Sequence, residues 1–347
     1  MIAWSGLSVW LLPLSLVLPI TLGLARTRQE AGLAACAYFA AALLPMTRSA
    51  AVFFHALASG LGWLLWTLCT AGYGLFFAAI WFAGYPLVSI TGGLILHALS
   101  PFGLASPLLA AGTLFPRAGF VGLLLLLSVI VLWTMERRRW AFGVLIAAST
   151  VCLIFNRPVR LLPDWKAVDT HLGGNGFHQN NGWMNYDAIQ LMNSEHTAAE
   201  NVIVFPENHL SVWDDQLIAP WLATGQKTEI VGAVYRGEKS VIVWGPHRDI
   251  YVARLPVPLA EWGNGAKPHW FGRSTVQVDG YRAAVFLCYE QLLVLPELES
   301  FSKHAQVVIA PSNLYWARNT NLNRIQMECL TAWSRLFRVP VVRAVNF

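Results

Sequence analysis

Three apolar, β-prone runs in the second half of the chain each end in polar side chains. The polar residues are Glu207 after "VIVFP", Cys288 and Glu290 after "AAVFL", and Ser312 with Asn313 after "VVIAP". Strand ends in layered α/β folds are where side chains converge on a pocket, so we expect these groups to share one site. A thiol there can attack a carbonyl carbon when a carboxylate takes its proton, and a second nucleophile can resolve the thioester. The pattern therefore indicates acyl transfer.

Each of these residues, taken alone, also fits a structural role. A single cysteine in an apolar strand usually packs as a small hydrophobic side chain. A glutamate just past a strand, as in "FPENHL", is commonly a helix-start or loop acid. The hypothesis of a catalytic site therefore depends on the combination, and not on Cys288 or Glu207 separately.

The segments that must position these residues alternate between two kinds. From about Asn201 onward, β-rich runs such as "NVIVFPE", "KSVIVWG" and "AQVVIAPSN" alternate with helix-like pieces such as "NRIQMECLTAWSRLF". Several runs are apolar throughout, as expected for strands that are covered on both faces. We therefore expect an α/β domain with layered sheets and outer helices over residues 157–347.

The first half of the chain is much more apolar. The 347 residues are 56% hydrophobic and 12% charged, with a mean hydropathy of +0.49, and charges are sparse before Phe155. Apolar runs cover Ser5–Ala25, Ala31–Met46, Ala50–Thr70, Tyr73–Leu99, Gly119–Thr134 and Trp140–Phe155. These runs predict a polytopic α-helical membrane domain of about six helices over residues 1–156. The proline-broken segment 100–116 is either a re-entrant or interfacial piece or one more span, and a further span would invert the count.

Charged loops predict the orientation. With six spans, the loop that holds Arg26 and Arg28 and the loop that holds Arg137–Arg139 fall on the same side of the membrane. The positive-inside rule makes that side cytoplasmic. We therefore expect a multi-pass protein of the bacterial inner membrane whose water-soluble half lies in the periplasm.

Composition excludes several other classes. The net charge of +5 comes without a basic stripe, which disfavours a nucleic-acid partner. The five cysteines form no CxxC pair, so neither a disulfide framework nor a zinc site is indicated, and no glycine-rich phosphate fingerprint points to a cofactor. A transporter is disfavoured because the apolar runs carry almost no Asp, Glu or Lys.

The strand-end segments resemble a known superfamily. "VFPENHL" is similar to the glutamate-bearing segment of the nitrilase, or carbon–nitrogen hydrolase, superfamily, and "AAVFLCYEQLL" is similar to its nucleophile elbow. "VVIAPSNLYW" and "RIQMECLTAWSRLFRVPVVRAVN" resemble the strands and helix that follow, so the resemblance covers about residues 201–346. The membrane half and the Cys-Tyr-Glu triplet resemble apolipoprotein N-acyltransferase. The compressed spacings look still more like the TraB-type conjugal-transfer proteins.

The resemblance implies a nitrilase-like α-β-β-α sandwich and a role for each site residue. Cys288 would be the nucleophile, Glu207 the general base and Glu290 a supporting acid, while Glu261 matches a further family glutamate. Candidate substrate-binding residues are Asn313, Trp316, Tyr289 and Lys267.

Two departures from the family pattern stand out. The catalytic lysine of the family is replaced by Ala253, and losing such an oxyanion donor typically costs about 10²–10³ in rate. We rank Arg254 first and Lys267 second as the replacement cation, name Lys239 as another donor, and keep a catalytically silent site as the third option. The chain also ends at Phe347, before the further strands that the family has. Either the proteins of this lineage are shorter or the sequence is truncated.

Two functional hypotheses follow. The first is cysteine-dependent acyl transfer or amide-bond chemistry on a membrane lipid or a membrane-embedded peptide such as a pilin, in plasmid conjugation. The second is a catalytically silent nitrilase-like module that binds other proteins of a conjugation apparatus. The missing lysine favours the second hypothesis, and the retained Glu207, Cys288 and Glu290 favour the first.

Overall fold

The computed structural model describes residues 2–53, 60–160, 162–172, 182–195, 199–216, 218, 227–258, 261–262 and 266–347. Its α-helices are α1 Val17–Leu22, α2 Arg28–Leu43, α3 Met46–Phe53, α4 Leu61–Ala79, α5 Pro86–Ala98, α6 Ala110–Leu114, α7 Gly119–Thr134, α8 Arg138–Ile154, α9 Gly182–Glu195, α10 Leu295–Ser302 and α11 Leu322–Phe337. Short 3-10 helices are η1 Ile2–Trp4, η2 Val9–Leu16, η3 Pro107–Leu109, η6 Cys288–Leu292 and η7 Tyr315–Ala317. The strands are β1 Trp165–Ala167, β2 Val202–Val204, β3 Thr228–Tyr235, β4 Glu238–Trp244, β5 Asp249–Val252, β6 Thr275–Val278, β7 Tyr281–Val285, β8 Val307–Ile309, β9 Ser312–Asn313, β10 Val341–Val342 and β11 Val345–Asn346.

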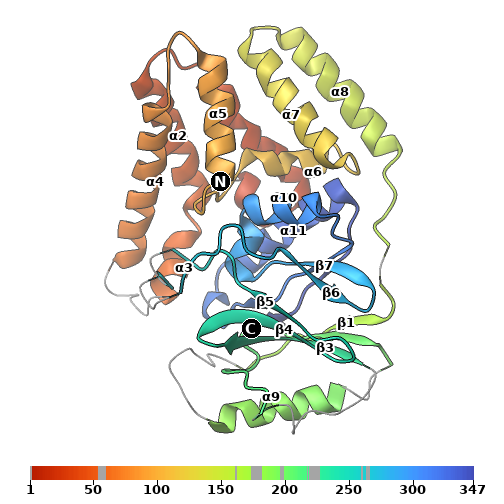
Figure 1. The fold of residues 1–347 in the computed structure, drawn as a ribbon. Coiled ribbons are helices and arrows are strands. Elements are labelled where there is room, and N and C mark those ends of the chain that lie inside the picture. Colours follow the sequence, from red (N-terminus) through yellow and green to blue (C-terminus); the bar gives the residue numbers. More distant parts are fainter. Residues whose placement is uncertain are drawn as a thin grey trace. The chain divides into compact units, whose positions relative to one another are not determined.

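The chain forms two compact units (Figure 1). The helical unit holds Met1–Val159, Leu292–Leu295 and Asn319–Arg338, and the sheet unit holds Arg160–Gln291, Pro296–Arg318 and Val339–Phe347. The expected boundary at residue 156 is close to the first division at Val159. The sequence analysis did not anticipate that α11 returns to the helical unit.

Close backbone contacts explain the place of α11. A Cβ added at Gly112 of α6 would lie 2.0 Å from the carbonyl oxygen of Ala332 in α11, so only glycine lets the two helices approach this closely. Arg117 also donates a backbone hydrogen bond to Arg335 O, 2.7 Å long. The face of α11 that carries Cys329 and Trp333 is buried, as expected for a helix with one apolar stripe.

Helices α2 and α4 form the most extensive helix pair of the helical unit. A Cβ added at Gly32 of α2 would lie 3.0 Å from Gly74 O of α4, and Phe39 stacks on Tyr73 with 4.0 Å between ring centroids. Thr27 and Glu30 form a capping box that begins α2. Small residues and stacked rings thus hold these helices at close range.

One described helix, Leu61–Ala79, is long and apolar enough to cross a membrane by itself. Up to three spans result if the bent pairs α2 with α3 and η3–α6 with α7 each count as one, and Val9–Leu22 and Pro86–Ala98 are shorter apolar helices. Residues 54–59 of the third predicted run lie outside the described residues. The six-span arrangement and its orientation remain predictions.

Among the described residues, the sheet unit contains a five-stranded sheet in the order β1-β2-β3-β4-β5. Strands β1, β2 and β3 are parallel, and β3, β4 and β5 are antiparallel. A two-residue turn, Arg236-Gly237, joins β3 to β4, and both residues have positive φ, as a type I′ hairpin turn requires. This turn fixes the register of β4 against β3.

The second sheet has the order β10-β8-β7-β6, with β10, β8 and β7 parallel and β6 antiparallel to β7. One core cluster joins residues from both sheets, including Val204 and Val243 of the first and Val285 and Ile309 of the second. The two sheets therefore pack face to face. A separate parallel pair, β9 with β11, continues the chain beyond β8 and β10.

Helices cover the outer faces of the two sheets (Figure 1). Ala188 and Met192 of α9 pack in a second core cluster with Ile203 and Val231 of the first sheet. Phe301 of α10 contacts Phe286, next to β7 of the second sheet, with 6.3 Å between ring centroids. The sheet unit is thus layered as helix, sheet, sheet, helix.

Candidate active site

A buried lysine joins two carboxylates at the ends of the first sheet. Lys239 Nζ lies 2.6 Å from Glu207 Oε1 and 2.5 Å from Glu261 Oε1. The side chain of Glu207 is 3% exposed and that of Lys239 is 16% exposed. Burial lowers the pKa of Lys239, but the charges of the two carboxylates outweigh it, so the net shift is upward and the ammonium is retained.

Lys239 stands directly beside the position where the family resemblance expected a lysine. Ala253 N donates a hydrogen bond of 2.9 Å to Lys239 O across the β4–β5 pair. Val241, Val243, Tyr251 and Ala253 face the core between the sheets, so strand alternation places Lys239 on that same face. The lysine of the cluster therefore comes from β4, the strand next to Ala253. The cluster contains a lysine although position 253 is an alanine.

Arg254, ranked first for the cation, belongs to a different set of contacts. Its guanidinium lies 3.1 Å from Tyr251 Oη, 2.5 Å from Glu299 Oε2 and 3.2 Å from Pro296 O. The side chain is 1% exposed. Arg254 is therefore a buried link between β5 and α10, and the prediction that it provides the cation beside Glu207 is corrected to Lys239.

Lys267, ranked second for that cation, is exposed. The ion pairs of Glu207 and Glu261 in the described part of the chain go to Lys239. Glu261 itself is held by a hydrogen bond from Val257 N to its Oε2, 2.7 Å long. One oxygen of the Glu261 carboxylate is thus held by Val257 N while the other pairs with Lys239.

Cys288 begins the η6 turn in a strained backbone conformation. Its φ is +27°, an unusual value for any residue other than glycine, and its thiol is half-buried. Cys288 N donates to Pro311 O at 3.1 Å, because β7 and β8 are parallel neighbours and their extensions run side by side. The nucleophile candidate therefore stands where β7 ends.

A chain of contacts connects Cys288 to the carboxylate cluster. Two residues after Pro311, Asn313 N donates to Glu207 Oε2 at 3.1 Å. Asn313 Oδ1 accepts a hydrogen bond of 2.9 Å from Asn346 Nδ2, and Asn346 Oδ1 in turn accepts from Thr170 Oγ1 at 3.0 Å. The ends of β2, β7 and β8 thus converge, as the strand-end pattern predicted.

Glu290 is bonded to residues outside the Glu207–Lys239–Glu261 cluster. Its carboxylate accepts from Leu287 N at 2.9 Å, Arg254 N at 2.7 Å, Leu255 N at 3.1 Å and Tyr251 Oη at 2.8 Å. Burial raises the pKa of Glu290, while Arg254 and the hydrogen bonds act in the opposite direction. Glu290 is therefore a buried anchor that fixes the turn after Cys288 against the end of β5.

Arg343 is a residue that the sequence analysis did not single out. It lies between β10 and β11, the segment whose Ala344 O accepts from Ser312 N at 2.9 Å. Burial lowers the pKa of Arg343, and electrostatic interactions with Cys288 and Asp169 act in the opposite direction. A signal for it was available, because the resemblance already placed "VVRAVN" in a strand of the same domain.

The remaining predicted residues surround the strand ends. Trp316 Nε1 donates to Asn313 O at 2.9 Å, which fixes the indole next to that loop, and Tyr289 is half-buried beside Cys288. In the part of the chain that the structure describes, no group of three His, Cys, Asp or Glu side chains is arranged to hold a metal ion. The chemistry available to the site comes from a thiol, carboxylates and an ammonium group.

Comparison with known proteins gives two relatives that span nearly the whole chain. The "Conjugal transfer protein TraB" of Agrobacterium fabrum is 30% identical over 384 residues, which cover 99% of this chain and 90% of that protein. The "Probable conjugal transfer protein TraB" of Sinorhizobium fredii is 29% identical over 378 residues, which cover 99% of this chain and 95% of that protein. No family model matches the chain.

Among solved structures, the chain is similar to a glutamine-dependent NAD+ synthetase from Acinetobacter baumannii in complex with adenosine diphosphate. The TM-score is 0.32 and the identity 13%, over 44% of this chain and 31% of that one. A similarity this low supports no argument about fold or chemistry.

Proposed function

The chain belongs to the family of the TraB conjugal transfer proteins, and from that premise we propose that it is a membrane-attached acyltransferase or amidase with a nitrilase-type site. The observation that carries the proposal is the Glu207–Lys239–Glu261 cluster, linked through Asn313 to the strand end that bears Cys288. A buried ammonium between two carboxylates near a strained cysteine is the donor set that thioester chemistry requires.

In the proposed reaction Glu207 takes the proton of Cys288 Sγ while the sulfur bonds to the carbonyl carbon of an ester or amide. The carbonyl oxygen gains negative charge, which the Lys239 ammonium stabilises. The bond to the alcohol or amine then breaks, and the leaving group receives the proton held by Glu207. The products of this half are a Cys288 thioester and a free alcohol or amine.

In the second half an amine or water attacks the thioester carbon. Glu207 accepts the proton of the incoming nucleophile and gives it to the sulfur as the carbon–sulfur bond breaks, which restores the thiol and the carboxylate. Glu261 keeps Lys239 charged and in place through both halves, since it pairs with the same ammonium group as Glu207. Glu290 acts as a positioning residue for the turn after Cys288.

The proposed substrate is a membrane lipid or a membrane-embedded peptide, handled during conjugal transfer. Two features support this class: the long apolar first half of the chain, and relatives named for conjugal transfer. The proposal includes the multi-pass placement in the inner membrane and the periplasmic side for the sheet unit. The hypothesis of a catalytically silent binding module was favoured by the missing family lysine. Lys239 in the cluster weakens that argument.

The test is intact-mass measurement and peptide mapping of the detergent-purified protein after incubation with native membrane lipids. We expect an acyl adduct on Cys288 that hydroxylamine removes, as a thioester requires, and its mass identifies the donor. Cys288→Ala should abolish the adduct, and Glu207→Gln should strongly reduce it.

The matched control is Cys69→Ala, which removes an exposed thiol of the helical unit and should leave the Cys288 adduct unchanged. A folded protein whose Cys288 stays unmodified by lipids, and reacts with iodoacetamide no faster than in Glu207→Gln, would overturn the enzyme proposal. The binding-module hypothesis would then replace it.

A further inference from the structure

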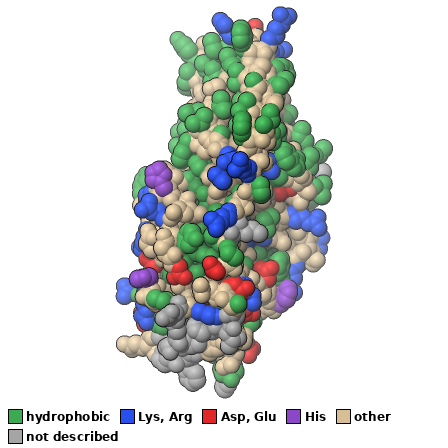
Figure 2. Space-filling view, turned by 90° about the vertical axis from the view of Figure 1, so that its right-hand side faces the viewer, with side chains coloured by type: hydrophobic (Ala, Val, Ile, Leu, Met, Phe, Trp, Pro, Cys, Tyr) green, Lys and Arg blue, Asp and Glu red, His purple; other side chains and the backbone are tan. Residues whose placement is uncertain are grey.

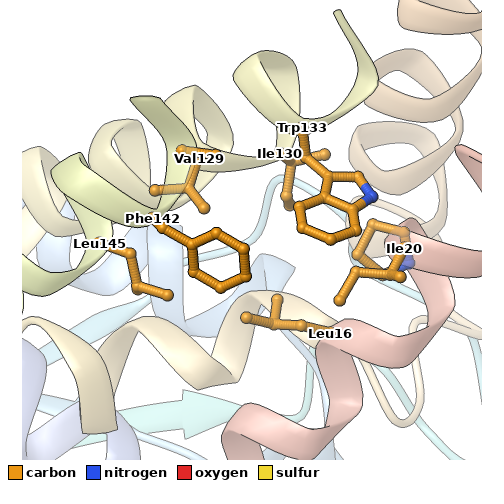
Figure 3. Close-up of a pocket in the computed structure, with 9 residues that line it drawn as sticks. Leu16, Ile20, Val129, Ile130, Trp133, Phe142 and Leu145 are labelled. Carbon is orange, nitrogen blue, oxygen red and sulfur yellow. The ribbon is translucent and has the colours of Figure 1, made fainter. Parts of the chain in front are cut away.

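A wholly apolar pocket lies within the helical unit, between η2–α1, α7 and α8. Its volume is about 110 Å³, and it is lined by side chains that carry no charge, including Leu16, Ile20, Val129, Phe142 and Leu145. Figure 3 shows Phe142 and Trp133 lying across the pocket from Leu16 and Ile20. Phe142 is 52% exposed, so the pocket reaches the surface of the unit. An open pocket with a lining of this kind favours hydrocarbon over water.

One end of the pocket is strongly basic. Trp133, which lines it, contacts the guanidinium of Arg138 through a cation–π interaction at 5.2 Å, and Arg137, Arg138 and Arg139 are all exposed at the α7–α8 turn. Figure 2 shows Lys and Arg side chains gathered at the tip of this unit beyond a band of hydrophobic ones.

A second basic loop reaches the same end. A Cβ added at Gly23 would lie 3.5 Å from Trp133 Cδ1, so the loop after α1, with Arg26 and Arg28, begins beside the pocket. The segments Arg26–Glu30 and Glu136–Arg139 together hold five arginines and two glutamates, and Arg28 Nε is engaged with Trp81 O at 3.1 Å, so the arginines of the α7–α8 turn are the main cations at this end. In addition, α8 begins here without a side-chain cap, so its first backbone N–H groups are available to an anion.

We propose that this pocket holds an acyl chain of an anionic phospholipid whose phosphate is bound by the arginines of the α7–α8 turn. The uncharged lining selects hydrocarbon and the arginine end selects an anion, and a phospholipid joins the two chemistries in one molecule. All nine lining residues belong to the helical unit and none to the Cys288 site, so the inference does not depend on the acyl-transfer proposal. It assigns this lipid a bound position and not the role of substrate.

The test uses the full chain in detergent with phosphatidylglycerol that carries a diazirine on one acyl chain, followed by photolysis and peptide mapping. Labelling is expected in residues 129–145 and is expected to be competed by unlabelled phosphatidylglycerol, more weakly by phosphatidylcholine, and little by inorganic phosphate. Ala141→Trp and Leu145→Trp fill the pocket, and each should reduce this labelling about tenfold, the loss expected when two buried CH₂ groups are displaced.

Two further variants separate the pocket from general lipid contact. Gly143→Trp places the same bulk on α8 where an added Cβ meets no atom within 4 Å, and it should leave the labelling unchanged. Arg138→Gln with Arg139→Gln should abolish the preference for phosphatidylglycerol over phosphatidylcholine.

Equal labelling by both lipids that neither pocket-filling variant reduces would mean ordinary contact with surrounding lipid, and would overturn the proposal. Full competition by inorganic phosphate would also overturn it, since the acyl chain would then contribute nothing. If one pocket-filling variant does not fold, the other and the arginine double variant still decide the outcome.

Discussion

At the scale of single residues, the cation of the candidate site depends on a pair of facing positions. Lys239 of β4 and Ala253, the residue directly after β5, are hydrogen-bonded neighbours, and strand alternation places both on the core face. Facing residues of antiparallel strands have Cβ atoms about 4.5–5.5 Å apart, a distance that the flexible stem of a lysine can span. A lysine at either position could therefore deliver its ammonium group to Glu207 and Glu261.

Moving the lysine between these positions tests its role. Lys239→Met should lower the rate of Cys288 acylation by about 10²–10³, the usual cost of removing one oxyanion donor. The double variant Lys239→Met with Ala253→Lys should recover at least about tenfold of that loss, because the ammonium group returns from the facing strand. The measurement is the rate of adduct formation by mass spectrometry.

The control for this comparison is Lys267→Met, which removes an exposed lysine and should leave the rate unchanged. If Lys239→Met acylates as fast as the parent protein, the ammonium has only a structural role.

The sequence indicated that Glu207, Cys288 and Asn313 would lie close together and named Lys239 among the possible donors, but it ranked Arg254 and Lys267 above that lysine. Glu207, Cys288 and Asn313 follow apolar runs, and their approach depends only on parallel strands ending at one edge. The lysine depends on register across the β4–β5 pair, which sequence periodicity along one strand cannot reveal. The Arg236-Gly237 turn was the available signal, because it ties β4 to β3 in one register and fixes which β4 residues share a face.

At the scale of elements, the η6 turn is held by one buried carboxylate. Glu290 accepts four hydrogen bonds, from Leu287, Arg254, Leu255 and Tyr251, and it is 1% exposed. Removing the charge leaves several buried donors without an ionised acceptor. The anchor therefore stabilises the positive φ of Cys288 at the start of the same turn.

Two substitutions of similar size should differ strongly in their cost. Glu290→Gln turns an amide NH₂ toward buried donors and should lower the free energy of unfolding by about 3–5 kcal/mol. Tyr251→Phe removes one of the four bonds to Glu290 and the bond that Tyr251 Oη accepts from Arg254 Nε, and it should cost less, about 2 kcal/mol. The measurement is the midpoint of thermal unfolding in detergent, where roughly 2–4 °C corresponds to each kcal/mol. Equal midpoints for the two variants would contradict the anchor.

Helix boundaries show where hydropathy alone was insufficient. The apolar run Tyr73–Leu99 was treated as one span, yet α4 ends at Ala79 and α5 begins at Pro86. Pro86 stands at the first helical position, where its missing N–H costs nothing, and it prevents α4 from continuing through this point. Apolar composition correctly predicted that this half of the chain is helical. The length of each helix depends on local breaks such as the one before Pro86.

At the scale of the whole molecule, stability should depend on pH through Glu229. This residue of β3 is 1% exposed, and burial raises its pKa to about 7, with Lys227 acting in the opposite direction. An unfolded glutamate has a pKa of about 4.3, so the folded state holds the proton more tightly. The stability from this residue is therefore complete below pH 4.3 and is lost as the pH rises through 7.

Glu229→Gln should remove this dependence. At pH 8 the variant should be more stable than the parent chain by up to about 3 kcal/mol, and near pH 4.5 the two should differ little. Thermal unfolding midpoints of both proteins at the two pH values provide the measurement, with Glu200→Gln as the control glutamate. A variant that is less stable than the parent at pH 8 would show that the ionised carboxylate is favoured in the folded state.

The return of α11 to the helical unit has a consequence for how the protein can be divided. The chain passes between the two units five times, at residues 159, 291, 295, 318 and 338. A gene fragment for residues 157–347 would therefore encode α11 without the α6 surface that receives Ala332, and its apolar stripe would be left in water. Coexpression of residues 1–156 with that fragment supplies the missing surface, so the two pieces are suited to complementation and not to separate purification.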